Sequence, residues 1–279
     1  MIYLIIASLI WAFSFGLIKT QLASLDPIAV SSVRLLLAVL VFTPFILRNN
    51  MQNRLQFMAL GAVQFGLMYV FYITSYKHLP AYAVALFTIF TPLYVALLDD
   101  LMNRKINIDR IVAVTIAIIG AGIAVWHALP QREAVVGILL LQVSNICFAV
   151  GQYYYRRLHS TADHSTKVGW MYLGATVVVT LLALVTGGFA DFQVTKTSAM
   201  TLLYLGVIPT GLCFWLWNRG AVKTSVSRLA ISNNLKIPVA IIVAWMFFGE
   251  SAPYLRVGLG IAVIIFALVI SNRKYTKIV

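Results

Sequence analysis

The sequence has few charged residues and very few acidic ones. Charged residues make up 10% of its 279 positions, and Asp and Glu together number only 8. A soluble domain has about 25% charged residues, because its surface must be hydrated. This chain is 61% hydrophobic, and a single core cannot hide that many apolar side chains from water. These shortages exclude a soluble globular fold.

Cysteines and enzyme motifs are also scarce. The 2 cysteines, Cys147 and Cys213, both lie inside apolar stretches, so a disulfide framework is not expected. The sequence has no His-Glu-x-x-His motif, no Cys-x-x-Cys motif and no glycine-rich phosphate loop. We therefore expect no enzymatic activity, no metal site and no cofactor. The net charge of +13 does not indicate nucleic acid, because most basic residues lie in short connections between apolar stretches.

The sequence consists mostly of long apolar stretches. Each is at least about 18 residues long, which is the length of an α-helix that crosses a bilayer. They occupy residues 2–19, 27–47, 55–76, 80–99, 110–127, 135–155, 167–186, 199–219, 224–247 and 254–271. Polar and apolar residues do not alternate along them, and helices satisfy their own backbone groups in lipid. The sequence therefore predicts an all-α integral membrane protein with ten transmembrane helices.

The basic residues indicate how these helices are oriented. Most Lys and Arg residues outside the spans fall on the side of the membrane that also holds both termini. Because Lys and Arg are enriched in cytoplasmic loops, both termini are predicted to be cytoplasmic. The first apolar stretch is expected to be a span and not a signal peptide, since it has no basic start. In the absence of a transit peptide or organelle signal, we expect a bacterial inner membrane.

The two halves of the sequence resemble each other. Gly61 and Pro92 of the first half recur as Gly206 and Pro238 of the second half. The predicted units are residues 1–128, residues 134–273 and a cytoplasmic tail at 274–279. Because each unit has five spans, an odd number, the second unit must cross the membrane inverted relative to the first. Inverted repeats are typical of secondary transporters, whose halves move about a site near the midplane.

Several short motifs, taken in order, resemble the EamA-type branch of the drug/metabolite transporter superfamily. They are Trp11-Ala12-Phe13-Ser14-Phe15, Val33-Arg34-Leu35-Leu36-Leu37-Ala38, Pro238 and Phe247-Phe248-Gly249-Glu250. The resemblance covers essentially the whole chain and implies a transporter that exports amino acids or other small metabolites. One position departs from the pattern, since the first half has Asn103-Arg104 where the second half has Gly249-Glu250. A mechanism with two symmetric glutamates is therefore not implied.

Two basic residues are predicted at mid-depth of their spans. Lys236 lies about 18 Å into its span and Arg34 about 12 Å into its own, at about 1.5 Å per residue. A charge at the bilayer centre costs about 2.5–3.5 kcal/mol or more, and no acidic residue is expected at the same depth. We hypothesise that Lys236 binds the carboxylate of a transported metabolite beside Pro238, which tends to kink the helix or to free backbone carbonyls. The alternatives are an uncharged Lys236 bonded to backbone carbonyls that Pro238 frees, and a structural tether between helices for Arg34.

Polar and aromatic side chains in the spans extend this candidate site. Gln142 and Asn145 belong to an amide stripe that faces either a cavity or a neighbouring helix. The predicted substrate-binding residues are Lys236, Asn233, Arg34, Trp11, Ser14, Gln64, Tyr72, Asn145, Gln142 and Trp215. A gating salt bridge at the cytoplasmic side is predicted between Arg228 and Asp99 or Asp100. The alternative is that Arg228 extends to the membrane surface without a partner.

Closely spaced glycines mark expected contacts between helices. Gly120 and Gly122 form one such pair, and Gly258 and Gly260 form another. Small residues let two helices approach closely in a membrane. We expect a packing role for these glycines and no contact with a ligand.

The expected function is export of small carboxylated metabolites by alternating access, with amino acids as the first candidates. An exporter of lipophilic cations or drugs is an alternative, but it needs a buried acid that no predicted span has near its centre. A non-transporting scaffold or sensor is a second alternative, for which the loops are too short to supply an output domain. The expected partners are a small-molecule substrate and the lipid bilayer, and a monomer is compatible with the sequence.

Overall fold

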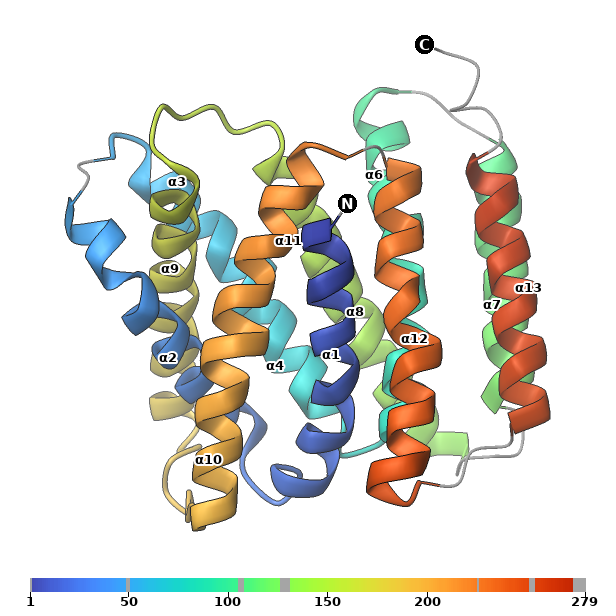
Figure 1. Ribbon diagram of the computed structural model, residues 1–279, viewed down its shortest axis with the longest axis horizontal. Helices are drawn as coiled ribbons and strands as arrows, with labels where there is room; N and C mark the ends of the chain where they lie inside the picture. Colours follow the sequence, from blue (N-terminus) through green and yellow to red (C-terminus); the bar gives the residue numbers. More distant parts are fainter. Residues whose placement is uncertain are drawn as a thin grey trace.

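The apolar stretches fold into a bundle of roughly parallel helical rods (Figure 1). The computed structural model describes residues 2–48, 51–104, 108–125, 131–224, 226–250 and 254–272. Within these ranges the regular structure is helical and there is no strand. Helices are expected for segments of this composition, because their backbone N–H and C=O groups bond within the segment.

Sixteen helical elements make up the described chain. They are α1 (Ile2–Gln21), α2 (Pro27–Arg48), α3 (Arg54–Gly61), η1 (Ala62–Leu67), α4 (Met68–Ser75), α5 (Ala81–Phe87), η2 (Thr88–Phe90), α6 (Thr91–Met102), α7 (Ile108–Val125), α8 (Gln131–Tyr155), α9 (His164–Val185), α10 (Lys196–Leu205), η3 (Gly206–Leu212), α11 (Cys213–Val222), α12 (Val226–Phe248) and α13 (Tyr254–Asn272). Elements η1 and η3 are π-helices, and η2 is a 3₁₀-helix.

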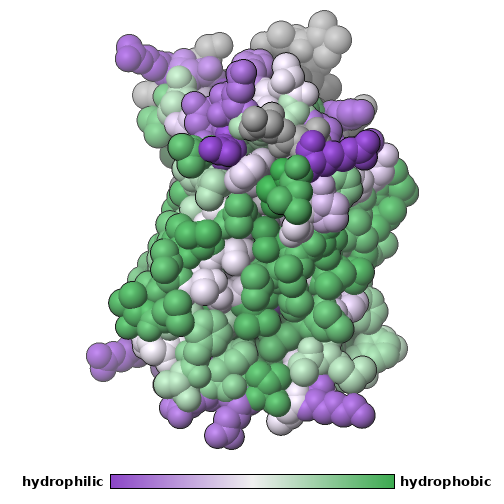
Figure 2. All heavy atoms as spheres, turned by 90° about the vertical axis from the view of Figure 1, so that its left-hand side faces the viewer, coloured by the Kyte–Doolittle hydropathy of each residue, from purple (hydrophilic) through white to green (hydrophobic). Residues whose placement is uncertain are grey.

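Much of this helical structure has the length and composition of membrane spans. Among the described residues, seven helical segments are long and apolar enough to cross a bilayer: Ile2–Gln21, Pro27–Arg48, Arg54–Ser75, Ala81–Met102, Arg132–Tyr155, His164–Val185 and Lys196–Val222. Shorter apolar segments occur at Ile111–Gly120, Ser232–Phe248 and Tyr254–Ala267. On the face seen in Figure 2, an apolar band covers the middle of the bundle, and hydrophilic side chains gather at both ends. The predicted all-α, multi-pass membrane fold is confirmed at this level.

Three rods change helix type near their middle. In the rod from α5 to α6 the change is the short 3₁₀-helix η2. The other two rods are interrupted by π-helices, η1 between α3 and α4 and η3 between α10 and α11. The residues at these two breaks are the glycines that repeat in the sequence, since α3 ends at Gly61 and η3 begins at Gly206. Pro209 lies inside η3, where it lacks a backbone donor. Helix α12, which carries Lys236, continues through Pro238 as one element.

Small residues allow helices α3 and α9 to approach each other very closely. A Cβ atom on Gly61 of α3 would lie 2.0 Å from the carbonyl oxygen of Met171 in α9, and one on Gly174 would lie 2.1 Å from that of Met58. The two helices therefore touch backbone to backbone, as small residues permit in membranes. The predicted packing role of Gly258 is wrong, because a Cβ atom there would meet no heavy atom of another described helix within 4 Å.

Polar contacts join the helices at both ends of the bundle. At the end opposite the N-terminus, the Glu250 carboxylate accepts hydrogen bonds from the backbone N–H groups of Ala81 (2.9 Å) and Tyr82 (3.1 Å). A carboxylate is favourable there because the first N–H groups of α5 have no partner within the helix. At the other end, Asp99 of α6 forms an ion pair with Arg157, with 3.0 Å between Oδ1 and Nη2.

Candidate functional site

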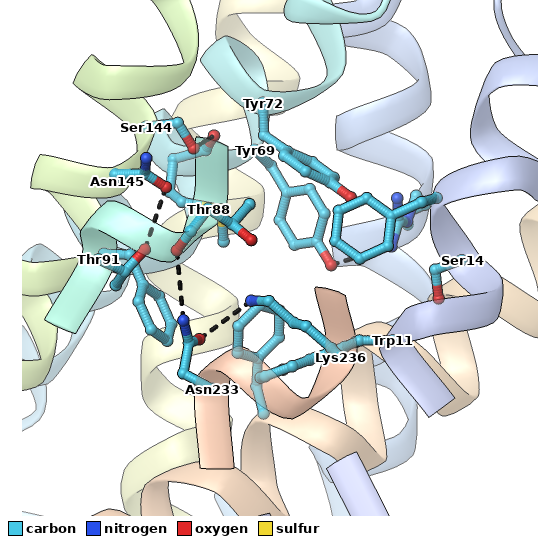
Figure 3. Close-up of a pocket in the computed structure, with 15 residues that line it drawn as sticks. Trp11, Ser14, Tyr69, Tyr72, Thr88, Thr91, Ser144, Asn145, Asn233 and Lys236 are labelled. Carbon is cyan, nitrogen blue, oxygen red and sulfur yellow. Dashed lines mark hydrogen bonds between the residues drawn. The ribbon is translucent and has the colours of Figure 1, made fainter. Parts of the chain in front are cut away.

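A cavity inside the bundle contains residues from both halves of the chain (Figure 3). Its volume is about 70 Å³, which is room for several water molecules or for the polar end of a small ligand. Its lining consists of Trp11, Ser14, Phe15, Arg34, Met68, Tyr69, Tyr72, Thr88, Thr91, Ser144, Asn145, Phe148, Phe214, Asn233 and Lys236. The lining thus has two cationic side chains and no carboxylate among the residues that the structure describes. Such a cavity favours an anion, because buried charges in a medium of low dielectric need a partner.

Lys236 enters this cavity from α12 (Figure 3). Its side chain is buried, and Nζ donates a hydrogen bond to Oδ1 of Asn233 at 3.0 Å. Asn233 in turn donates to the backbone oxygen of Thr88 at 3.2 Å, which fixes the orientation of its amide. Nζ also lies 5.4 Å from the centroid of the Trp11 ring, within the range of a cation–π interaction. Because an ammonium group has three donors, Lys236 can bond a ligand in addition to Asn233.

Arg34 lies in the same cavity with only 1% of its side chain exposed. Its Nε donates to Oγ1 of Thr210 at 3.2 Å, and its Nη2 donates to the Tyr69 hydroxyl at 2.9 Å. The Tyr69 and Thr210 hydroxyls are 3.0 Å apart, so the three side chains form a closed triangle across α2, α4 and η3. Nη1 has no hydrogen-bond partner in the described structure. Arg34 therefore ties helices together and still has one donor for a ligand.

We expect Arg34→Lys to lower both the amount of folded protein and the transport rate per folded molecule, the latter about tenfold or more. An ammonium group lacks the planar fork of N–H groups with which the guanidinium bonds to Thr210 and Tyr69 at once and keeps Nη1 available. Size-exclusion recovery measures the first effect, and exchange in proteoliposomes measures the second. Arg48→Lys is the matched control, because Arg48 ends the same helix with an exposed side chain. Wild-type behaviour of Arg34→Lys would mean that a positive charge alone suffices at this position.

Three aromatic and hydroxyl residues predicted for the site also line the cavity. Nε1 of Trp11 donates to the backbone oxygen of Pro209 at 2.8 Å, which connects the cavity to the π-helix η3. The Ser14 hydroxyl bonds within its own helix, at 3.4 Å. The Tyr72 hydroxyl lies 2.7 Å from that of Tyr76. Trp11 therefore links the cavity lining directly to the π-helix η3.

The amide stripe of α8 is divided between the cavity and the packing behind it. Asn145 lines the cavity, where Oδ1 accepts from the Thr91 hydroxyl at 3.1 Å and Nδ2 donates to the backbone oxygen of Phe87 at 2.9 Å. Gln142 is not part of the lining. Its Oε1 accepts from Asn145 at 3.2 Å and from the Tyr94 hydroxyl at 2.9 Å. Gln142 thus supports the orientation of Asn145.

Two further predicted residues lie outside the cavity lining. Gln64 is fully buried and donates to Oδ1 of Asn218 at 3.1 Å. Trp215 lies near the start of α9, where its Nε1 donates to the Ser165 hydroxyl at 3.0 Å. The structure therefore brings together Lys236, Asn233, Arg34, Trp11, Ser14, Tyr72 and Asn145.

The gating residues are placed only in part. Asp99 pairs with Arg157 from the end of α8, and Asp100 is the next residue of α6. Arg228 belongs to α12, but its side chain lies outside the described residues. The predicted contact between Arg228 and these acids therefore stays a prediction.

Several lining residues were not predicted from the sequence. Thr88, Thr91 and Ser144 are the polar residues among them. Tyr69 also lines the cavity, and it belongs with Tyr72 to the amphipathic wall that the sequence predicts along this span. The hydroxyl residues gave no signal, because Ser and Thr in membrane helices commonly bond to their own backbone. Within the described residues, no three His, Cys, Asp or Glu side chains gather where they could hold a metal ion.

Known proteins resemble this chain over nearly its full length. A model of the EamA-like transporter family matches residues 1–126 and 135–273. A probable biotin transporter of Pseudomonas aeruginosa is 35% identical over 273 residues, with 95% of each chain covered. The biotin transporter of Escherichia coli is 34% identical over 249 residues, which covers 87% of this chain and 83% of that one. A probable terminal-alkyne amino-acid exporter of Streptantibioticus cattleyicolor is 26% identical, with 97% and 92% covered. One solved crystal structure shares the fold with a TM-score of 0.69 at 14% identity, covering 99% and 98% of the two chains.

Proposed function

This chain belongs to the EamA-like transporter family, as its motifs suggested, and we propose that it carries a small carboxylated metabolite, with biotin as the first candidate. The proposal of biotin is supported by relatives named as biotin transporters that match most of the chain. Biotin has an aliphatic carboxylate at one end and a ring system with a neutral ureido group at the other. The proposed location is a bacterial inner membrane.

One observation of the site carries the proposal. Arg34 and Lys236 line the same buried cavity, and no carboxylate among the described residues bonds to either side chain. The carboxylate of a substrate would neutralise this cavity and accept the free donors of both cations. The aromatic rings of Trp11, Phe148 and Phe214 offer apolar walls for a hydrocarbon chain. A lipophilic cation would instead meet two positive charges there.

We further propose ten spans in two inverted halves, at residues 1–128 and 134–273, with both termini and the 274–279 tail in the cytoplasm. Two features support a duplicated architecture. The family model matches the chain twice, and the π-helices η1 and η3 occur at corresponding places in the two halves. Alternating access would then come from movement of one half against the other about the shared cavity.

Counterflow in proteoliposomes tests the substrate class. Vesicles loaded with unlabelled biotin are expected to accumulate labelled biotin, and external biotin should compete. The neutral amide of biotin should compete poorly, because it retains the rings and the chain but lacks the charge that Arg34 and Lys236 would bind. Exchange of amino acids without exchange of biotin would favour the function named for the Streptantibioticus relative. Exchange of organic cations would contradict the proposal.

A further inference from the structure

A second group of buried polar side chains lies one helical turn from the cavity. Its members, named the amide layer here, are Gln64, Gln152, Trp217, Asn218 and Ser232. Four of them lie four residues from a lining residue on the same rod: Gln64 from Met68, Gln152 from Phe148, Asn218 from Phe214 and Ser232 from Lys236. Residues four apart share a helix face and are separated by about 6 Å along the axis.

All four offsets point toward the same end of the bundle. In Figure 1, α3 and α11 lie at the end near the N-terminus, whereas α4 and α10 lie at the opposite end. The rod of Gln64 runs away from the N-terminal end, and Gln64 comes before its lining residue Met68. The rod of Asn218 runs toward that end, and Asn218 comes after its lining residue Phe214. Both residues therefore lie between the cavity and the N-terminal end of the bundle. The layer is joined across rods, since Gln64 bonds to Asn218 at 3.1 Å and lies against Gly151, the neighbour of Gln152.

The amide layer is rich in polar atoms that no described residue satisfies. Its members are at most 2% exposed. Gln64 Oε1, both polar atoms of Gln152, Trp217 Nε1, Asn218 Nδ2 and Ser232 Oγ have no hydrogen-bond partner among the described residues. Whichever way the two bonded amides are turned, their pair leaves one donor and one acceptor unused. Buried polar atoms in proteins are nearly always bonded, so this concentration indicates a place where a ligand supplies the partners.

The unused atoms define the chemistry of that ligand. They include donors, on Gln152, Trp217 and Asn218, and acceptors, on Gln64 and Gln152. An anion would need donors only and a cation would need acceptors only. A neutral amide or urea, with N–H groups and a carbonyl side by side, matches the mixture. From this geometry we infer that the amide layer binds a neutral ureido or amide group of the substrate, while Arg34 and Lys236 hold its carboxylate.

An aromatic cluster joins the two polar regions. The ring centroid of Trp217 lies 5.3 Å from that of Trp11 and 6.4 Å from that of Phe148, and Trp11 lies 4.8 Å from Phe214. A substrate with a carboxylate, a hydrocarbon middle and a ureido ring fits this order. The cavity itself has room only for the carboxylate end, so the ring system reaches the amide layer when these aromatic side chains turn aside. This assignment rests on the proposed function and specifies the orientation of the substrate.

Equilibrium binding of two ligands to the purified full-length protein tests the inference. Biotin has the ureido group, whereas lipoate has a similar aliphatic carboxylate on a sulfur ring without it. We expect the wild type to prefer biotin by about tenfold or more, because hydrogen-bonding sites discriminate strongly against analogues that lack the bonded group. Gln152→Leu should lose about tenfold in biotin affinity and change lipoate affinity less than about threefold. The double variant Gln64→Leu/Asn218→Leu should behave in the same way without leaving one amide unpaired.

The controls separate folding, orientation and substrate class. Gln152→Leu should melt no lower than the wild type, because it removes a buried amide that has no partner. Gln193→Leu changes an exposed glutamine and should leave both affinities unchanged. An unaltered preference for biotin in both layer variants, with binding still dependent on Lys236, would overturn the inference and leave the proposed function standing. Biotin binding that is indifferent to Lys236→Ala would overturn both.

Discussion

Lys236→Ala is expected to lower the initial rate of biotin exchange about 30-fold or more, while the protein still folds. The loss follows from the position of Nζ in the cavity, where its one hydrogen bond to a described residue goes to Asn233. Removing one member of a buried, hydrogen-bonded charge pair costs about 2–5 kcal/mol, and about 1.4 kcal/mol corresponds to tenfold. Folding should survive, because the ammonium of Lys236 has no carboxylate partner among the described residues that its removal would leave unpaired.

The measurement is exchange in proteoliposomes, normalised to the amount of protein recovered as a single peak by size exclusion. Lys196→Ala serves as the matched control, because it makes the same chemical change at an exposed position at the start of α10. Wild-type exchange by Lys236→Ala would remove this residue from the binding site. Among the described lining residues, Arg34 would then be the one cation left to bind a carboxylate.

Gly61→Ala should destabilise the folded protein by about 3 kcal/mol, the upper end of the usual range for overpacking. The added methyl group would lie 2.0 Å from the carbonyl oxygen of Met171, which is a backbone atom and cannot turn aside as a side chain can. Helices α3 and α9 would have to separate. Gly174→Ala should act similarly, because its methyl group would meet the carbonyl oxygen of Met58 at 2.1 Å. Thermal unfolding in detergent, followed by tryptophan fluorescence, measures the effect.

Gly258→Ala is the control for this prediction. Its added methyl group meets no heavy atom of another described helix within 4 Å, and alanine favours a helix by about 1 kcal/mol relative to glycine. The melting temperature of this variant should equal or slightly exceed that of the wild type. If Gly61→Ala and Gly258→Ala melted alike, the close contact between α3 and α9 would not be a determinant of stability.

The sequence by itself determined the class of the protein and its two most informative residues. Helical membrane spans could be predicted because the length and composition of an apolar stretch are local properties that the bilayer selects directly. Arg34 and Lys236 could be singled out for a similar reason, since a charge within such a stretch is costly wherever the helix packs. The motifs were sufficient to identify the family.

Only the tertiary structure decided which polar side chains meet. Gln64, Gln142 and Trp215 carry amide and aromatic side chains, as several lining residues do, yet they lie outside the cavity lining. The reason is that the facing side of a membrane helix depends on its neighbours, and these come from segments far apart in the sequence, as where Arg34 bonds to Thr210. Periodicity along one helix places residues on a common face, but it does not specify what that face contacts. The packing role of a glycine likewise depends on the tertiary structure, because a close helix contact requires another backbone segment opposite that glycine.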